Sequence, residues 1–269
     1  MINRQVIKPE RMNALPPSEW LKFTKTWFVL NPPPRLRKIV HPATFPENLV
    51  ASFIEFFTKP GDWVLDPFLG SGTTLIVARQ LNRNGVGIEL YSKFTNFSKN
   101  AVFQIKSESQ SVILKGDCRE ILPRLKTQNI SDIDFCITSP PYWCQLGTVG
   151  ERNGKRKKEG LKTKYGHYRN DLGNIQDYNA FLREQERVFN MVHDVLKPNS
   201  YLVVVTNNVY RNGRLYPLAF DTFKSLSKLW VPKDEKIWCQ DNKHLYPFGM
   251  FHSYIGNRSH HYCLVFKKN

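Results

Sequence analysis

A glycine-containing loop is the first group of residues whose types and spacing could do chemistry. The string Asp66-Pro67-Phe68-Leu69-Gly70-Ser71-Gly72-Thr73-Thr74 follows a short apolar run and precedes a helical pattern. Glycines allow a sharp turn and let backbone N–H groups approach a ligand closely. A phosphate-binding P-loop is the obvious alternative, but that motif requires lysine where Thr73 follows Gly72. Taken alone, the loop is equally consistent with an ordinary tight turn between a strand and a helix.

Two later carboxylates favour a ligand. Glu89 ends the apolar run Gly85–Glu89, where a doubly wound fold places an acid that binds ribose hydroxyls. Asp117 follows the run Val112–Lys115, where a carboxylate could accept a hydrogen bond from an adenine amino group. Each acid alone could be a helix N-cap. Together with Asp66 they indicate a nucleoside cofactor without phosphates, because a pocket lined by carboxylates repels a pyrophosphate.

A second string has the character of a rigid polar corner. Asp134-Phe135-Cys136-Ile137-Thr138 reads as a buried strand, and Ser139-Pro140-Pro141-Tyr142-Trp143 follows it directly. The prolines fix the backbone and leave carbonyl groups without competing N–H donors. Such a corner can present fixed acceptors to an amino group while an aromatic ring stacks on a planar base. A rigid loop with aromatic packing explains the two prolines alone, but it explains the whole string less well.

Strands that alternate with helices must position these groups. Apolar runs of strand length are followed by helical patterns, the clearest being 49–57 and 181–196. This alternation predicts βαβ units and a parallel sheet. The predicted strands are Trp63–Asp66, Gly85–Glu89, Val112–Lys115, Ile133–Thr138, Tyr201–Thr206 and, at the end of the chain, His261–Phe266.

The two strings resemble the cofactor and catalytic motifs of the amino-methylating (N4/N6) DNA methyltransferases, which use S-adenosylmethionine. Three flanking segments resemble other parts of that family: His41-Pro42-Ala43-Thr44-Phe45-Pro46, 196–202 and 261–266. The resemblance implies an α/β, Rossmann-like class I methyltransferase fold with a mostly parallel seven-stranded sheet and an antiparallel closing strand.

The resemblance also implies roles for individual residues. Ser139 and the Pro140 carbonyl would orient the amine of a base flipped out of duplex DNA, and Tyr142 would stack on that base. Glu89 would hold the ribose and Asp117 the adenine of the cofactor. The implied catalytic residues are Ser139, Pro140, Pro141 and Tyr142; the implied cofactor residues are His41, Ala43, Thr44, Asp66, Phe68, Gly70, Ser71, Gly72, Thr73, Glu89, Asp117 and Cys118.

In that family, serine at the first position of the catalytic tetrapeptide accompanies methylation of cytosine N4 more often than methylation of adenine N6, for which aspartate or asparagine is usual. We therefore expect a cytosine-N4 DNA methyltransferase of a restriction-modification system. Its expected partners are double-stranded DNA and a cognate restriction endonuclease. Adenine N6 or an RNA amino group are the alternatives within the same fold. A catalytically silent nucleic-acid-binding protein is the alternative of a different class.

The charge distribution supports a polyanionic partner. The 269 residues carry a net charge of +16, yet residues 41–140 contain ten basic and ten acidic residues. Residues 151–170 hold eight basic residues against two acids, so we expect them to contact phosphates; a solvated charged loop is the alternative. The expected DNA-binding residues are Arg152, Lys155, Arg156, Lys157, Lys158, Lys162, Lys164 and Arg169.

The remaining features concern organisation and location. We expect a basic, aromatic N-terminal segment at 1–40 and one methyltransferase domain at 41–269, with a basic loop insertion at about 144–175. The stretch 20–38 suits either a second contact surface or aromatic packing. Five cysteines without a CxxC pair suit reduced thiols in a cytoplasm, and no apolar run is long enough for a membrane-spanning helix. The family resemblance implies a prokaryotic cell, in which the protein would be associated with the nucleoid through DNA binding. His260, His261 and Cys263 are expected to be ordinary strand residues, with no metal required.

Overall fold

The computed structural model describes residues 11–31, 45–128, 130, 132–144, 168, 170–250 and 254–269. Its strands are β1 (Trp27–Val29), β2 (Trp63–Asp66), β3 (Asn84–Glu89), β4 (Ser111–Lys115), β5 (Ile133–Thr138), β6 (Leu196–Thr206), β7 (Val209–Arg211), β8 (Arg214–Tyr216), β9 (Val231–Cys239) and β10 (His260–Lys267). Its α-helices are α1 (Pro17–Phe23), α2 (Glu47–Phe57), α3 (Thr73–Gln80), α4 (Ser92–Phe103), α5 (Cys118–Ile121), α7 (Tyr178–Val195) and α8 (Leu218–Leu226). Short 3₁₀ turns lie at Leu122–Arg124, Lys126–Gln128 and Leu172–Asn174.

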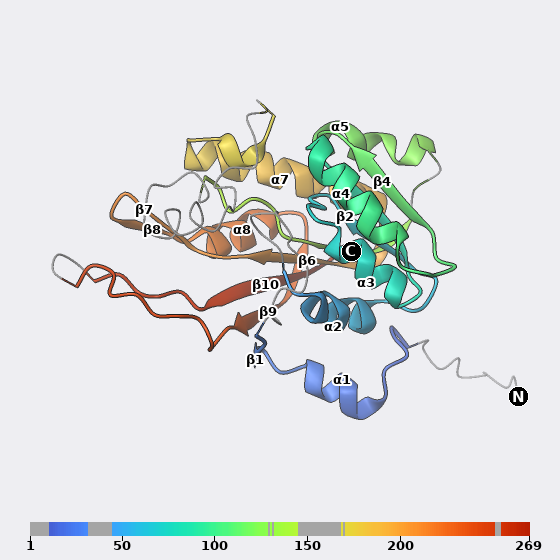
Figure 1. Cartoon of the computed structure of the whole chain (residues 1–269), viewed down its shortest axis with the longest axis horizontal. Helices are drawn as coiled ribbons and strands as arrows, with labels where there is room; N and C mark the ends of the chain where they lie inside the picture. Colours follow the sequence, from blue (N-terminus) through green and yellow to red (C-terminus); the bar gives the residue numbers. More distant parts are fainter. Residues whose placement is uncertain are drawn as a thin grey trace, which may run out of the picture.

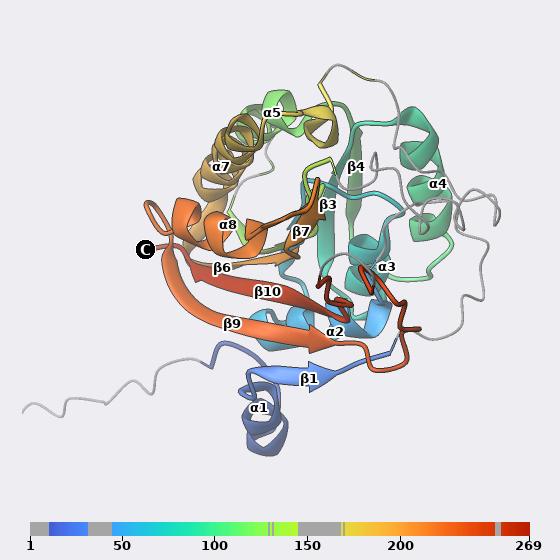
Figure 2. The same cartoon turned by 90° about the vertical axis from the view of Figure 1, so that its left-hand side faces the viewer.

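One sheet organises the chain. Among the described residues its strand order is β1-β9-β10-β6-β5-β2-β3-β4 (Figures 1 and 2). The pairs from β6 through β5, β2 and β3 to β4 are parallel, and β10 is antiparallel to both β6 and β9. The order reverses between β2 and β5, and ligands bind at such a switch point in open α/β sheets. The mostly parallel sheet with an antiparallel closing strand is therefore as predicted.

The strand number differs from the prediction, because eight strands rather than seven form this sheet in the described part of the chain. The eighth is β1, which pairs in parallel with β9 through Trp27, Phe28 and Val29. Figure 2 shows β1, β9, β10 and β6 lying side by side in that order. Residues 27–29 belong to the stretch that we had placed in the N-terminal segment. Their three-residue length explains why no strand pattern is visible there.

Helices cover both faces of the sheet. Alternate strand residues point to opposite sides, and because apolar residues occur on both sides, each face has to be covered. In β5, Phe135 and Ile137 pack in the cluster that contains α2, whereas Cys136 packs in the cluster that contains α7 and α8. The apolar stripe of α7 is buried against the second face through Phe181, Val188, Phe189, Val192 and Val195. None of the described helices is both long and apolar enough to cross a membrane.

Aromatic packing fixes the described part of the N-terminal segment. The Phe23 ring stacks on Phe56 of α2 with centroids 3.9 Å apart, and it meets Phe53 edge-on at 5.4 Å. The ammonium of Lys236 on β9 donates to the Phe23 and Lys25 carbonyl oxygens and lies over the Phe23 ring. Packing therefore accounts for Phe23, while Trp20 and Trp27 keep about half of their surface exposed.

Replacing Phe23 by alanine should lower the free energy of unfolding by about 2 kcal/mol, because the ring packs on three phenylalanines but is only partly buried. Lys22→Ala is the matched control: this neighbour makes only an exposed ion pair with Glu19, so its loss should cost less than about 1 kcal/mol. Denaturant titration of both variants makes the comparison. Equal effects would mean that the N-terminal segment does not depend on this packing.

Candidate active site

The predicted cofactor loop lies at the carboxyl end of β2 and leads into α3. Gly72 is the N-cap of α3 and adopts a left-handed φ of 90°, which glycine tolerates without steric cost. A Cβ atom at Gly72 would lie 3.0 Å from the Ser98 Cβ of α4. The loop side chains Ser71 and Thr73 approach each other, with their hydroxyl oxygens 3.3 Å apart. The loop is therefore a tight turn closely packed on α4.

A buried carboxylate, Asp66, ties this loop to the catalytic strand. Only 1% of Asp66 is exposed. Its Oδ1 accepts hydrogen bonds from the Phe68 N–H at 3.0 Å and from the Thr138 hydroxyl at 2.6 Å. Its Oδ2 accepts from the Thr74 hydroxyl at 2.6 Å. Burial raises the pKa of Asp66, and the three donors act against that rise. These contacts give Asp66 a loop-shaping role.

Glu89 lies directly beneath the loop, at the carboxyl end of β3. Its Oε2 accepts from the Gly70 N–H at 2.9 Å, and its Oε1 accepts from the Tyr91 N–H at 2.7 Å. Burial raises the pKa of Glu89 to about 7, although both backbone donors lower it. Because β2 and β3 are adjacent and parallel, the structure brings Glu89 and the loop together as the sequence predicted. Hydroxyl donors that approach the Glu89 carboxyl would therefore favour its ionised form.

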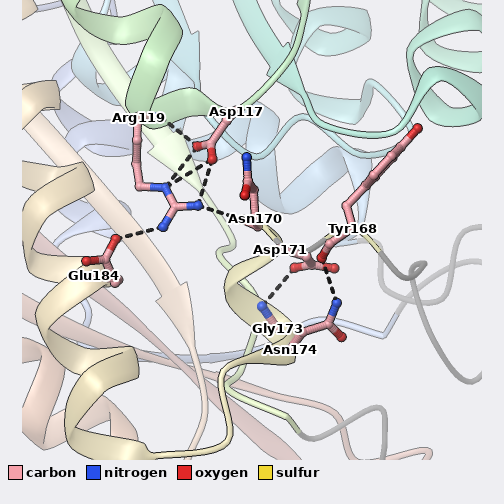
Figure 3. Close-up of polar contacts among 8 residues, drawn as sticks. All are labelled: Asp117, Arg119, Tyr168, Asn170, Asp171, Gly173, Asn174 and Glu184. Carbon is pink, nitrogen blue, oxygen red and sulfur yellow. Dashed lines mark hydrogen bonds and ion pairs between the residues drawn. The ribbon is translucent and has the colours of Figure 1, made fainter.

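Asp117 caps α5, and its carboxylate already has a cationic partner. Arg119 donates from Nη2 to the Asp117 Oδ2 at 2.6 Å and from its backbone N–H to Oδ1 at 2.9 Å. The same guanidinium reaches the Glu184 carboxylate at 2.7 Å and the Asn170 carbonyl at 2.6 Å (Figure 3). An adenine amino group would therefore have to share the Asp117 oxygens with Arg119. Sequence reasoning missed this pairing because Arg119, although only two residues from Asp117, is held there by Glu184 and Asn170, which are distant in the chain.

The end of the predicted loop insertion is packed rather than free. Asp171 is buried, and it accepts from the Gly173 N–H at 2.8 Å and from the Tyr91 hydroxyl at 2.6 Å. Leu172 lies in the main hydrophobic core. Figure 3 shows Asp171 beside Tyr168 and close to the Asp117–Arg119 pair. Asp171 and Leu172 thus anchor the end of the predicted insertion to the core, while the insertion at about 144–175 lies largely outside the described residues and stays a prediction.

The catalytic string leaves β5 beside this pocket. β5 is adjacent to β2 in the sheet, so the string and the cofactor loop emerge from neighbouring strand ends. Trp143 takes a left-handed φ of 49°, and its ring packs against Tyr178 and Tyr216. The Arg211 guanidinium lies 4.7 Å from the centre of the Trp143 ring. This packing holds the backbone turn that directs Ser139 to Tyr142 away from the strand.

Within the string, the Ser139 hydroxyl donates to the Tyr142 hydroxyl at 3.1 Å. Burial raises the pKa of Tyr142, so the phenol keeps its proton at neutral pH. The Tyr142 oxygen also lies 3.3 Å from Nδ1 of His261 on β10. Sequence reasoning treated His261 as an ordinary strand residue, since nothing local connects it to Tyr142.

The other predicted residues divide into two groups. Pro140 is buried, Pro141 and Phe68 are partly buried beside the site, and burial raises the pKa of the Cys118 thiol. The cofactor candidates His41, Ala43 and Thr44 lie outside the described residues. So do all of the predicted DNA-binding residues: Arg152, Lys155, Arg156, Lys157, Lys158, Lys162, Lys164 and Arg169.

The fold and this site define a Rossmann-like methyltransferase, which confirms the predicted fold class. A solved S-adenosylmethionine-dependent methyltransferase from Methanosarcina mazei superposes with a TM-score of 0.50 at 12% identity, over 80% of this chain and 96% of that one. The DNA methylase family model N6_N4_Mtase matches residues 5–100 and 133–269. The chain therefore belongs to the N6/N4 DNA methylase family, and S-adenosylmethionine is the cofactor that this family implies.

Individual relatives match shorter stretches. The chain is 45% identical over 73 residues to the type II methyltransferase M.Cfr9I of Citrobacter freundii, covering 27% of this chain and 23% of that protein. It is 39% identical over 99 residues to the type II methyltransferase M.HinfI of Haemophilus influenzae, covering 36% of this chain and 27% of that protein. The matches thus span about a quarter of these relatives' lengths.

The residues at the strand ends fit S-adenosylmethionine. The cofactor carries a positive sulfonium and no phosphate, and the acids Asp66 and Glu89 next to the loop would favour such a charge. Glu89 would accept from the ribose hydroxyls, while the loop from Gly70 to Thr73 would hold the methionine part. The chain offers no lysine after Gly72 for a phosphate.

Cofactor affinity should depend on pH through Glu89. With a pKa of about 7, the carboxyl is largely neutral below pH 7, and ribose hydroxyls bind the ionised form better. Affinity should therefore rise from pH 6 to pH 8, by up to about tenfold per unit below the pKa. Titration calorimetry with S-adenosylmethionine between pH 6 and pH 8 measures this change in affinity.

Glu89→Gln is the control for this pH dependence, because the amino group of the cofactor titrates in the same range. The variant should bind more weakly at pH 8 and lose the Glu89 component of the pH dependence. Identical pH profiles for the variant and the parent protein would contradict the assignment of Glu89 to the ribose.

Proposed function

We propose that this protein transfers a methyl group from S-adenosylmethionine to the exocyclic N4 amine of a cytosine in duplex DNA. Membership of the N6/N4 DNA methylase family supports an amino group of DNA as the target class. Ser139 at the first position of the catalytic tetrapeptide is the feature that favours cytosine within that class. The cofactor supplies an electrophilic methyl group; the residues of this chain bind and orient the two reactants.

The observation that carries the proposal is the link between the two motifs. Asp66 accepts from Thr74 of the cofactor loop and from Thr138 of the catalytic strand, at 2.6 Å in both cases. Ser139 follows Thr138 directly, so the acceptor for the amine and the loop for the cofactor are held by the same carboxylate. Fixed relative placement of two reactants is a major source of rate enhancement. A protein that only binds nucleic acid has no need of this link.

The target base must leave the helix, because its amino group lies inside the duplex. Tyr142 would stack on the extruded base, and the Ser139 oxygen and Pro140 carbonyl would accept from its amino group. Ser139 is a poor base at neutral pH, so its role is orientation. In a direct displacement the amine nitrogen would take the methyl group, the sulfur of the cofactor would leave as a neutral thioether, and one amine proton would pass to solvent during or after transfer. This route needs no covalent intermediate with the protein.

The DNA backbone would be held by the cationic parts of the chain. Residues 151–170 with eight basic side chains are the proposed phosphate contacts, because phosphate neutralisation by lysine and arginine supplies most non-specific DNA affinity. The relatives M.Cfr9I and M.HinfI are type II methyltransferases. We propose the same restriction-modification setting here, with a cognate restriction endonuclease as partner.

Nucleoside mass spectrometry tests this function. The protein is incubated with S-adenosylmethionine and unmethylated duplex DNA of mixed sequence, or with RNA as the comparison. We expect N4-methylcytosine from the DNA only. N6-methyladenine instead would overturn the base assignment, and product from RNA only would overturn the substrate class. Binding of DNA with no product from either substrate, in the presence of bound cofactor, would indicate a silent binding protein.

A further inference from the structure

A chain of three polar side chains runs from the catalytic string to a strand on the other side of β6. The Ser139 hydroxyl lies 3.1 Å from the Tyr142 hydroxyl, and that oxygen lies 3.3 Å from Nδ1 of His261. Ser139 and Tyr142 follow β5, whereas His261 belongs to β10, and β6 separates these two strands in the sheet. This hydrogen-bonded series of side chains therefore depends on the tertiary fold. It connects Ser139, the proposed amine-orienting residue, to an imidazole ring that can accept or donate a hydrogen bond.

The His261 ring is held by packing. His261 and Trp238 are paired across β10 and β9, and their rings stack with centroids 4.7 Å apart and planes 23° apart. Trp238 is buried, and its Nε1–H donates to the Leu30 carbonyl at 2.7 Å. Leu30 in turn donates its N–H to the Cys239 carbonyl at 3.0 Å. The plane of the imidazole is thus set by a supported stack, and the 3.3 Å contact with Tyr142 places Nδ1 on the side of the catalytic string.

The direction of the hydrogen bonds decides what Ser139 can offer a substrate. If Nδ1 accepts, the Tyr142 proton points to His261 and the Ser139 proton points to Tyr142, so the Ser139 lone pairs remain free to accept from an amine. If Nδ1 donates, the Tyr142 proton is released to point to Ser139, and in that reversed arrangement the Ser139 proton is free. That proton would form a hydrogen bond with the lone pair of the amine. Methyl transfer requires this lone pair as the nucleophile, so the reaction would be blocked. The same three residues therefore either orient the nucleophile or block it, depending on the imidazole tautomer.

We propose that His261 is a positioning residue for methyl transfer: its Nδ1 accepts from Tyr142 and so turns the Ser139 lone pairs toward the target amine. The inference rests on the proposed function, in which Ser139 orients that amine. Since Tyr142 keeps its proton, it can serve as both acceptor and donor in the chain. His261 acts through Tyr142 and needs no contact with the substrate.

Single-turnover methylation separates this role from simple packing. The substrates are S-adenosylmethionine and unmethylated mixed-sequence duplex DNA, with protein in excess over sites. His261→Phe keeps a flat ring on Trp238 but removes the acceptor, and should slow the methyl-transfer step about tenfold, the effect of one lost hydrogen bond. Dissociation constants for cofactor and DNA should change less than about twofold, because no binding contact is removed.

His261→Asn is the matched rescue variant, since its amide oxygen occupies the position of Nδ1 without the ring. It should recover most of the rate that His261→Phe loses, even though it lacks the stack. Tyr142→Phe should slow the step by a similar factor, and adding His261→Phe to it should slow the step no further, because both changes break one chain. An unaltered rate in His261→Phe, a failure of His261→Asn to recover, or additive losses would each overturn the proposal.

A spectroscopic measurement tests the inference without activity. Long-range ¹H–¹⁵N NMR of the unmodified protein distinguishes the two imidazole tautomers, and we expect the proton of His261 on Nε2 at pH 8. A proton on Nδ1 would overturn the proposal even if the protein methylates DNA. Conversely, an inactive protein with the expected tautomer would count against the proposed function and leave the hydrogen-bond chain intact.

Discussion

The hydrogen bonds accepted by the buried carboxylate of Asp66 are the interactions on which the rest of the site depends. It stands where β2 ends and accepts hydrogen bonds from both motifs, through Thr74 in the cofactor loop and Thr138 in the catalytic strand. A buried carboxylate is costly unless donors surround it. Asp66 has three donors within 3.0 Å. The need to satisfy this one group therefore fixes the distance between two loops that must act together.

The carboxylates of Glu89 and Asp117 have partners of a different kind. Glu89 accepts only from backbone N–H groups in the described part of the chain, and burial leaves its pKa near 7. Asp117 is neutralised by Arg119, whose guanidinium also anchors the Asn170 carbonyl. Asn170, the last residue of the basic stretch 151–170, is thus fastened to Arg119 next to Asp117.

Local patterns could be predicted from the sequence because they depend on neighbouring residues. β2 (Trp63–Asp66) and β5 (Ile133–Thr138) have the predicted bounds, since both are short, mainly apolar runs that end in a polar residue. The positions of Asp66 and Glu89 followed from the same reasoning. β9 (Val231–Cys239) was missed because charged residues and Pro232 interrupt its apolar pattern. The β7–β8 hairpin was not predicted, although the Asn212-Gly213 pair is typical of a two-residue hairpin turn and both residues take left-handed φ values.

Partners that meet only through the fold could not be predicted. Arg119 reaches Glu184, and Tyr142 reaches His261, 119 residues later in the chain. The sequence motifs place one member of each pair, but strand order places the other. The strand β1 was missed for a related reason, because its three residues form a strand only by pairing with β9. The candidate site residues are thus identified by local motifs, whereas their partners are set by the order of strands in the sheet.

The most direct test of the central role of Asp66 is the affinity of Thr138→Val for S-adenosylmethionine, measured by calorimetry. The change keeps the shape of a buried residue and removes one donor to Asp66, so affinity should fall about tenfold, as expected for one hydrogen bond to a charged group. Thr206→Val is the control, because the buried Thr206 hydroxyl has no partner among the described residues. It should bind normally. Unaltered affinity in Thr138→Val would contradict the claim that Asp66 couples the catalytic strand to the cofactor loop.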